Sequence, residues 1–250
     1  MRIIPNWRFP EASERELSRS LQEATRDSVV FMRDLLSGMK FDATDDEIAR
    51  AEEEVESKVM EIFMAVAAGL LSLGVTIYRF NSKQWLAIAI ASGGKDNPSV
   101  LMLDRFGASG LEPWYNEKMN LWKGTAENSI IKLAREISSD WSRNVRSFAA
   151  REANEKVVDA EINKRYAIYG SWSKNRASGI IGTFNSMLMR QRIKDAGVTH
   201  YIWRGKLDER ERASHILLEG VKRALNGAGI FPGEEYNCRC WAVPYWNKDK

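Results

Sequence analysis

The stretch that decides the fold runs from Tyr201 to Cys240 and reads YIWRGKLDERERASHILLEG, a short spacer, and FPGEEYNCRC. It holds both cysteines of the chain and one of its two histidines, together with an Asp and several Arg residues. Alternation from Val198 to Trp203 predicts a strand, Asp208 to Leu225 is expected to turn back as a helix, and Cys238 to Tyr245 predicts a returning strand. The C-terminal part of the chain is therefore expected to form a small α+β module with a local site built into it.

A bound zinc ion is the first interpretation of this site. Asp208 and His215 are seven residues apart, so on a helix they would face the same way. Cys238 and Cys240 would point to one face of an extended strand. Two thiolates, an imidazole and a carboxylate can make a tetrahedral zinc set. A single C-x-C pair with one His differs from the knuckles of most structural zinc sites, so the spacing alone is weak evidence for zinc.

Two other interpretations remain open. Arg210, Arg212 and Arg239 could lower the pKa of a cysteine whose proton passes to His215, which would make a nucleophilic Cys–His pair. No oxyanion-hole loop can be recognised in the sequence, however. The interpretation we favour is a closed polar cluster, in which Asp208 pairs with the arginines while the histidine and the cysteines pack beneath. On this interpretation the chain is not an enzyme, and it needs neither a catalytic residue nor a cofactor.

Outside the module the sequence predicts a mainly α protein with long antiparallel helices. Thr44 with Glu47 forms a capping box at the start of the second helix. A helix is predicted to about Tyr169, after which Ser171 and Ser173 are candidate caps of a further helix. The loop at 106–113 is the best internal boundary. We expect an N-terminal helical region (1–80), a helical middle region (81–172) and the C-terminal module (173–250).

The apolar run from Ile62 to Tyr78 has seventeen residues without a charge, which is near the lower limit for spanning a bilayer. Gly69 and Gly74 interrupt it, and Glu61 and Arg79 flank it closely. We therefore expect a buried helix that passes into a short strand, rather than a membrane partner.

Composition indicates a globular protein with a mild net charge of +3. Two cysteines one residue apart cannot link distant segments, so the chain is expected to be made in a reducing cytoplasm. Basic residues outnumber acidic ones from Arg151 to Arg223, and the reverse holds from Asp42 to Glu61. Genomic DNA is thus a candidate partner. The residues that could contact its phosphates are Lys174, Arg176, Arg190, Arg192 and Lys194.

This module contains an ordered series of residues, which consists of Trp203, Arg204, Asp208, Glu209, Arg210, Arg212, Ser214, His215, Gly220, Pro232, Gly233, Cys238, Arg239 and Cys240. The series resembles the phage Mu F-like minor head proteins, also called head morphogenesis proteins. The similarity is clearest over residues 173–244 and extends more faintly from residue 81. One departure is Ala213, which stands where that family commonly has Pro.

The resemblance implies a structural protein of a tailed double-stranded DNA bacteriophage. Such a protein is a minor head component of the virion, made in the host cytoplasm and located at the portal vertex or capsid interior. Its expected partners are the portal protein or the major capsid protein, and its expected role is in head morphogenesis, DNA packaging or DNA ejection. A metal-dependent hydrolase or Cys–His enzyme and an accessory DNA-binding virion protein are the alternatives.

Overall fold

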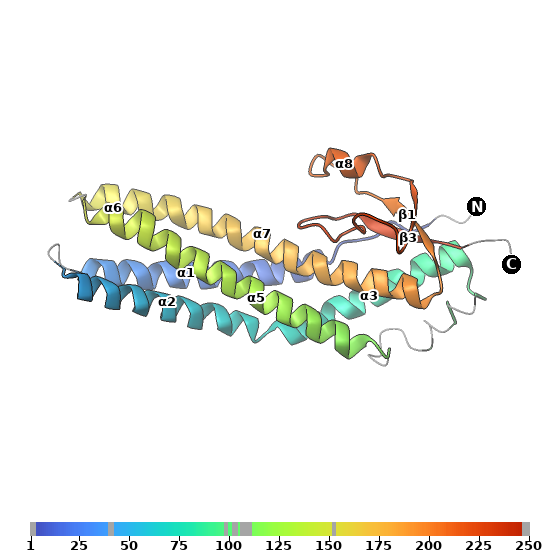
Figure 1. The fold of residues 1–250 in the computed structure, drawn as a ribbon, viewed down its shortest axis with the longest axis horizontal. Helices are drawn as coiled ribbons and strands as arrows, with labels where there is room; N and C mark the ends of the chain where they lie inside the picture. The colour runs from blue at the N-terminus through green and yellow to red at the C-terminus, as the bar shows by residue number, and fades with distance from the viewer. Residues whose placement is uncertain are drawn as a thin grey trace. The chain divides into compact units, whose positions relative to one another are not determined.

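The protein is mainly helical and carries a small three-stranded antiparallel sheet near its C-terminus, as Figure 1 shows. The computed structural model describes residues 4–39, 43–97, 100–101, 105, 112–151 and 154–246. The predicted fold class is confirmed. The elements are α1 (Glu11–Gly38), α2 (Asp45–Ala67), α3 (Leu70–Gly93), α5 (Tyr115–Trp141), the π-helical η1 (Ser142–Arg146), α6 (Ser147–Ala149), α7 (Glu155–Asp195), β1 (His200–Arg204), α8 (Ala213–Ile216), β2 (Lys222–Ala224) and β3 (Trp241–Tyr245).

The chain forms two compact units, each built from separate stretches of sequence. Unit 1 consists of Met1–Glu14, Leu71–Lys123 and Ser178–Lys250, and unit 2 of Arg15–Leu70 and Gly124–Ala177. This division differs from the three consecutive regions expected, because α5 and α7 each contribute residues to both units. Most of the loop predicted at 106–113 lies outside the described residues.

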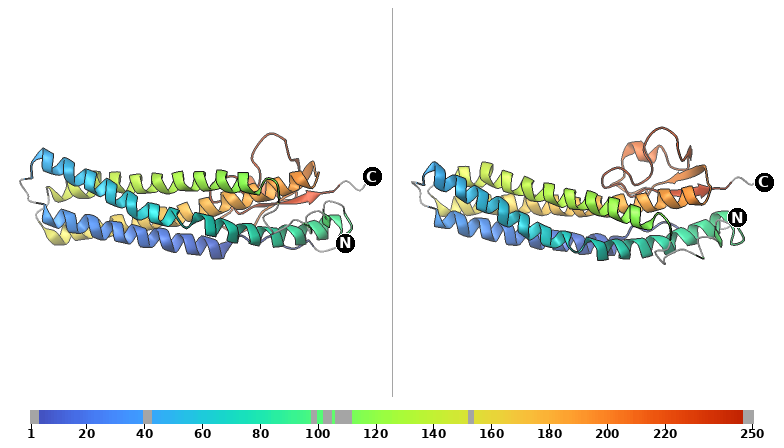
Figure 2. Two further views of the ribbon diagram at one scale, coloured as in Figure 1. Left: turned by 90° about the horizontal axis from the view of Figure 1, so that it is seen from below. Right: turned by 60° about the horizontal axis from the view of Figure 1, so that its bottom comes forward.

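Unit 2 is a bundle of long helices. α1 and α2 run antiparallel beside the parts of α5 and α7 that belong to this unit, as Figures 1 and 2 show. The predicted capping box is confirmed: Thr44 accepts from the backbone of Glu47, whose carboxylate accepts from the backbone of Thr44. Polar contacts also cross the bundle, where the hydroxyl of Tyr169 donates to the carboxylate of Asp140 at 2.7 Å. The apolar residues buried in this unit include Leu21, Met32, Val59, Phe63, Ile130, Leu133, Ile137 and Ile162.

Two predicted details of the helices are wrong. A break near Ser171 and Ser173 does not occur, because α7 continues through both residues. Ser173 is fully buried and its hydroxyl hydrogen-bonds to that of Thr25 at 2.7 Å, so tertiary packing satisfies a side chain that resembled a cap. The run from Ile62 to Tyr78 does not pass into a strand, since α2 and α3 keep it helical apart from a turn at residues 68–69.

Within the described residues, the stretch Asp45–Gly93 is long and apolar enough to cross a membrane by length and composition. Its most apolar window has a mean hydropathy of 1.9, and 33% of that window is buried inside the protein. Core helices of soluble proteins also meet these criteria. The expected absence of a membrane partner stays a prediction.

Unit 1 joins the sheet to the ends of α3 and α7. β1 is the central strand and pairs antiparallel with β2 and β3, in the order β2-β1-β3. Gly74 on α3 allows close packing, because a Cβ there would lie 2.6 Å from Met119 and from Trp122. Trp122 also donates from its indole to the carbonyl of Ile180 at 3.0 Å. The core around the sheet includes Trp7, Trp85, Ile88, Met189, Ile193, Tyr201, Trp203, Phe231, Ala242 and Val243.

The module follows the predicted strand, helix and strand only in part. β3 lies within its predicted strand, and β1 extends one residue beyond its own, to Arg204. The helix expected from Asp208 to Leu225 is reduced to the four residues of α8, and its end forms the strand β2 instead. The physical reason is local, because Leu207 has a positive φ of 53° and the carboxylate of Asp208 accepts from the backbone N–H of Arg210 at 3.1 Å. This bond holds the chain in a turn that competes with a helix.

Candidate functional site

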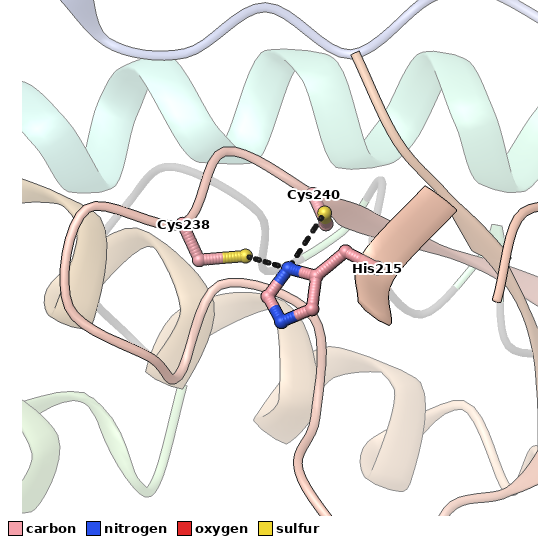
Figure 3. A group of neighbouring side chains, drawn as sticks. All are labelled: His215, Cys238 and Cys240. Atoms are coloured by element: carbon pink, nitrogen blue, oxygen red, sulfur yellow. Dashed lines mark hydrogen bonds between the residues drawn. The ribbon is translucent and has the colours of Figure 1, made fainter. Parts of the chain in front are cut away.

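The candidate site lies in unit 1 and joins α8 to the loop directly before β3. His215 lies on α8, and Cys238 and Cys240 belong to the loop; their side chains are 2%, 5% and 7% exposed. Figure 3 shows both thiols pointing toward one ring nitrogen of His215. The Sγ atoms of Cys238 and Cys240 lie 3.4 and 3.6 Å from Nδ1. The structure thus brings together three of the four residues predicted for zinc, with ligand atoms within 4.8 Å of one another.

The imidazole ring is held from its other sides as well. Nε2 of His215 lies 2.9 Å from a carboxylate oxygen of Glu235, although off the direction of a hydrogen bond. Arg212 contacts the same carboxylate at 3.4 Å and donates to the carbonyl of Tyr236 at 2.7 Å. The buried ring of Trp203 stands edge-on to the imidazole, with 5.3 Å between ring centroids. These contacts orient Nδ1 toward the two thiols.

The two thiols differ in acidity. A hydrogen bond from the Cys240 thiol, helped by the backbone at Cys240 and Gly233 and by the charge of His215, lowers the pKa of Cys238 to about 6, although burial acts to raise it. The same hydrogen bond raises the pKa of Cys240, and burial adds to the rise. The charge of Cys238 and the carboxylate of Glu211 act in the same direction on Cys240. Cys238 is therefore the more acidic of the two thiols.

Asp208, the fourth residue predicted for zinc, is engaged elsewhere. Both of its carboxylate oxygens accept from Nη2 of Arg239, each at 2.7 Å. The carboxylate near the thiols is that of Glu211, whose Oε1 accepts from the Cys240 thiol at 3.3 Å. The helical spacing of Asp208 and His215 was the reason for grouping them, and the turn at Asp208 removes that reason. Arg210, whose side chain is exposed, contributes its backbone N–H to this turn.

The other residues of the series shape the loops. Gly220 and Gly233 have positive φ angles of 75° and 84°, a region that favours glycine. A Cβ at Gly233 would also lie 3.0 Å from the Cβ of Ser186, whose hydroxyl donates to the carbonyl of Pro232. Arg204 pairs with Glu219 at 2.7 Å. These contacts fix the turns that carry the candidate site.

Solvent has little access to the site. The cavity beside His215, Cys238 and Cys240 measures about 20 Å³. That volume holds one water molecule or one ion, since a single water needs about 10–15 Å³ by the same measure. It is too small for an organic substrate, so the hydrogen-bonded thiols and imidazole form a closed cluster rather than an open cleft.

Two acidic residues of the site were missed in the sequence. Glu211 lies next to Cys240, and Glu235 lies next to His215. The spacing of four residues between Glu211 and His215 is a signal that could have drawn attention to the first. Glu235 follows the Pro232-Gly233 turn and has no comparable spacing signal.

The five basic residues predicted to contact DNA differ in their burial and in their ion pairs. The prediction is wrong for Arg192, which is 1% exposed and donates to Ser82 at 2.6 Å and to Glu112 at 3.3 Å. Arg176 is paired with Glu136 at 2.7 Å. Arg190 forms an ion pair with Glu234, while the side chains of Lys174 and Lys194 are exposed.

Comparisons with known proteins place the chain in no family. No family model matches it, and no solved structure matches it. An uncharacterized protein of Haemophilus influenzae is 28% identical over 139 residues. The match covers 53% of this chain and 30% of that relative, so the chain corresponds to less than a third of the relative's length.

Proposed function

We propose that this chain is a structural component of the head of a tailed double-stranded DNA bacteriophage, present as a minor protein at the portal vertex or the inner capsid. It acts in head morphogenesis, DNA packaging or DNA ejection, and it contacts the portal protein or the major capsid protein. The observation that carries the proposal is the ordered series from Trp203 to Cys240, whose side chains and turns build one closed cluster.

The closed cluster supports a structural role over an enzymatic one. An enzyme built on Cys238 and His215 needs room for a substrate at the thiol, and a cavity of about 20 Å³ gives none. Exposed apolar side chains on and after α8 suit a protein contact instead, because Ile216, Leu217 and Val221 are 46%, 80% and 41% exposed. We expect this part of the module to bind the portal or capsid partner.

DNA binding is the weaker alternative. Arg192 is buried, and Arg176 and Arg190 already pair with carboxylates, so the predicted basic helix offers few free cations for phosphates. The two exposed lysines, Lys174 and Lys194, remain candidates for a weak, salt-dependent contact.

Particles purified from the phage or prophage-bearing strain that encodes the chain test the proposal. We expect mass spectrometry to find the chain in DNA-filled heads at a few copies per particle, and a nonsense allele to abolish infectious particles. Leu217→Asp should reduce incorporation into heads, whereas Val30→Asp, at another exposed apolar position, should not. The proposal fails if the chain is absent from heads at every stage of assembly and the nonsense allele leaves the yield of infectious particles unchanged.

A further inference from the structure

The spacing of the three buried side chains is that of ligands around a zinc ion. Zinc in proteins lies about 2.3 Å from a thiolate sulfur and about 2.0–2.1 Å from an imidazole nitrogen, so a tetrahedral arrangement separates these two ligand atoms by about 3.6 Å. In the structure Nδ1 of His215 lies 3.4 Å from Sγ of Cys238 and 3.6 Å from Sγ of Cys240. Both sulfur–nitrogen distances fit a zinc ion between these atoms.

Hydrogen bonds alone leave the donors and acceptors of His215, Cys238 and Cys240 poorly satisfied. A neutral imidazole has one N–H and one acceptor nitrogen. The negative charge of Glu235, 2.9 Å from Nε2, favours a proton on that nitrogen and leaves the lone pair on Nδ1. The two sulfur atoms then converge on one lone pair inside a buried site, and at most one S–H can donate to it. A cation at the centre would instead be bound by His215, Cys238 and Cys240 together.

The carboxylate of Glu211 lies beside these three residues but is not part of their set, since the ligand atoms within 4.8 Å of one another are those of His215, Cys238 and Cys240. Oε1 of Glu211 lies 3.3 Å from Sγ of Cys240, close to the sulfur–oxygen spacing of about 3.6 Å expected around zinc. Gly205 makes room for this carboxylate, because a Cβ there would lie 2.0 Å from Oε1. The cavity of about 20 Å³ beside these residues is large enough for one ion.

We propose that His215, Cys238 and Cys240 bind one zinc ion that ties α8 to the loop before β3, and that the carboxylate of Glu211 turns onto the metal as the fourth ligand. Two thiolates and an imidazole favour zinc over magnesium or calcium, which prefer oxygen ligands. Both thiols lose their protons on binding. Four protein ligands leave no open position, so the site is structural. It is independent of the proposed virion role, because all four ligands come from one chain.

Metal content of the untagged full chain is the first measurement. After expression in zinc-supplemented medium, we expect inductively coupled plasma mass spectrometry to find one zinc per chain. His200→Gln alters the other histidine, which is partly exposed on β1, and should retain one zinc. Cys238→Ser should lose zinc or bind it more weakly by a factor above 100, since loss of a supporting contact alone costs about 10- to 100-fold.

Cobalt substitution keeps the test decisive if Cys238→Ser does not fold. Wild-type chain stripped with a chelator and given Co²⁺ should show thiolate-to-cobalt charge-transfer absorption, and its thiols should react more slowly with an alkylating reagent when metal is present. A folded wild-type chain that holds no zinc and gives no such absorption would overturn the proposal. Equal zinc binding by wild type and by folded Cys238→Ser would overturn it as well, because the metal would then lie elsewhere.

Discussion

The ion pair between Asp208 and Arg239 gives the sharpest prediction about stability. The pair is neither exposed nor deeply buried, because the two side chains are 33% and 14% exposed. Exposed pairs contribute about 0.2–1 kcal/mol, whereas removing one partner of a buried pair costs about 3–5 kcal/mol. Asp208→Ala removes two charge-assisted hydrogen bonds of 2.7 Å and the bond from the N–H of Arg210. We therefore expect it to lower the free energy of unfolding by about 2 kcal/mol, or the Tm by about 4–8 °C in a protein of this size.

A double-mutant cycle isolates the pair. Unfolding in guanidinium chloride, followed by tryptophan fluorescence and circular dichroism, is measured for Asp208→Ala, Arg239→Met and the double variant. The coupling free energy should be about 1–2 kcal/mol. Asp27→Ala is the control, because its pair with Arg26 is 55% and 60% exposed and should change stability by no more than about 0.5 kcal/mol. Coupling within about 0.3 kcal/mol of zero between Asp208 and Arg239 would refute the reasoning.

Three further predictions concern the helices. Gly74→Ala should destabilise the protein by about 1–3 kcal/mol, because the added methyl group overpacks the core. Gly124→Ala should stabilise it by about 0.5–1 kcal/mol, because a Cβ there would have no atom within 4 Å. Equal effects of the two variants in chemical denaturation would contradict the packing described. Thr44→Ala should cost about 1 kcal/mol through loss of the capping box, and an unchanged unfolding midpoint would exclude this. Burial and the hydrogen bond to Asp140 raise the pKa of Tyr169 in the folded protein. The contribution of this hydrogen bond to folding stability is therefore fully present below the pKa of about 10 that tyrosine has in the unfolded chain, and it is lost as the pH rises above that value. Tyr169→Phe should therefore be less stable than wild type at pH 8 by about 1–2 kcal/mol, with a gap that narrows at pH 11; a constant gap would disprove the assignment.

Local signals in the sequence were sufficient for the fold class and for several elements. The capping box at Thr44 was correct because its two hydrogen bonds join residues three positions apart. The break predicted at Ser171 and Ser173 was wrong because the partner of Ser173 is Thr25, which lies 148 residues away in the sequence. A side chain that resembles a cap cannot be distinguished from a buried polar contact until the packing is known.

The candidate site shows the same difference between what local sequence signals predict and what depends on the path of the chain. The rarity of cysteine and histidine was enough to group His215, Cys238 and Cys240, which the structure brings together. Asp208 was grouped with them and Glu211 was missed, because the grouping assumed a helix where an Asp side chain and a positive φ hold a turn. Which carboxylate faces the thiols depends on the path of that turn, and no spacing rule describes it.

The two units also order the folding of the chain on the ribosome. Unit 2 is complete once Ala177 has been made, whereas unit 1 combines Met1–Glu14 with a segment that begins at Ser178. At about 5–20 residues per second, synthesis from Glu14 to Ser178 takes about 8 to 33 s. During that interval Phe9 lacks the surface beside Gly182 on which it packs, and Trp7 lacks most of its core. The segment that holds Trp7 and Phe9 therefore keeps two aromatic side chains exposed for longer during synthesis than the segments of unit 2 do.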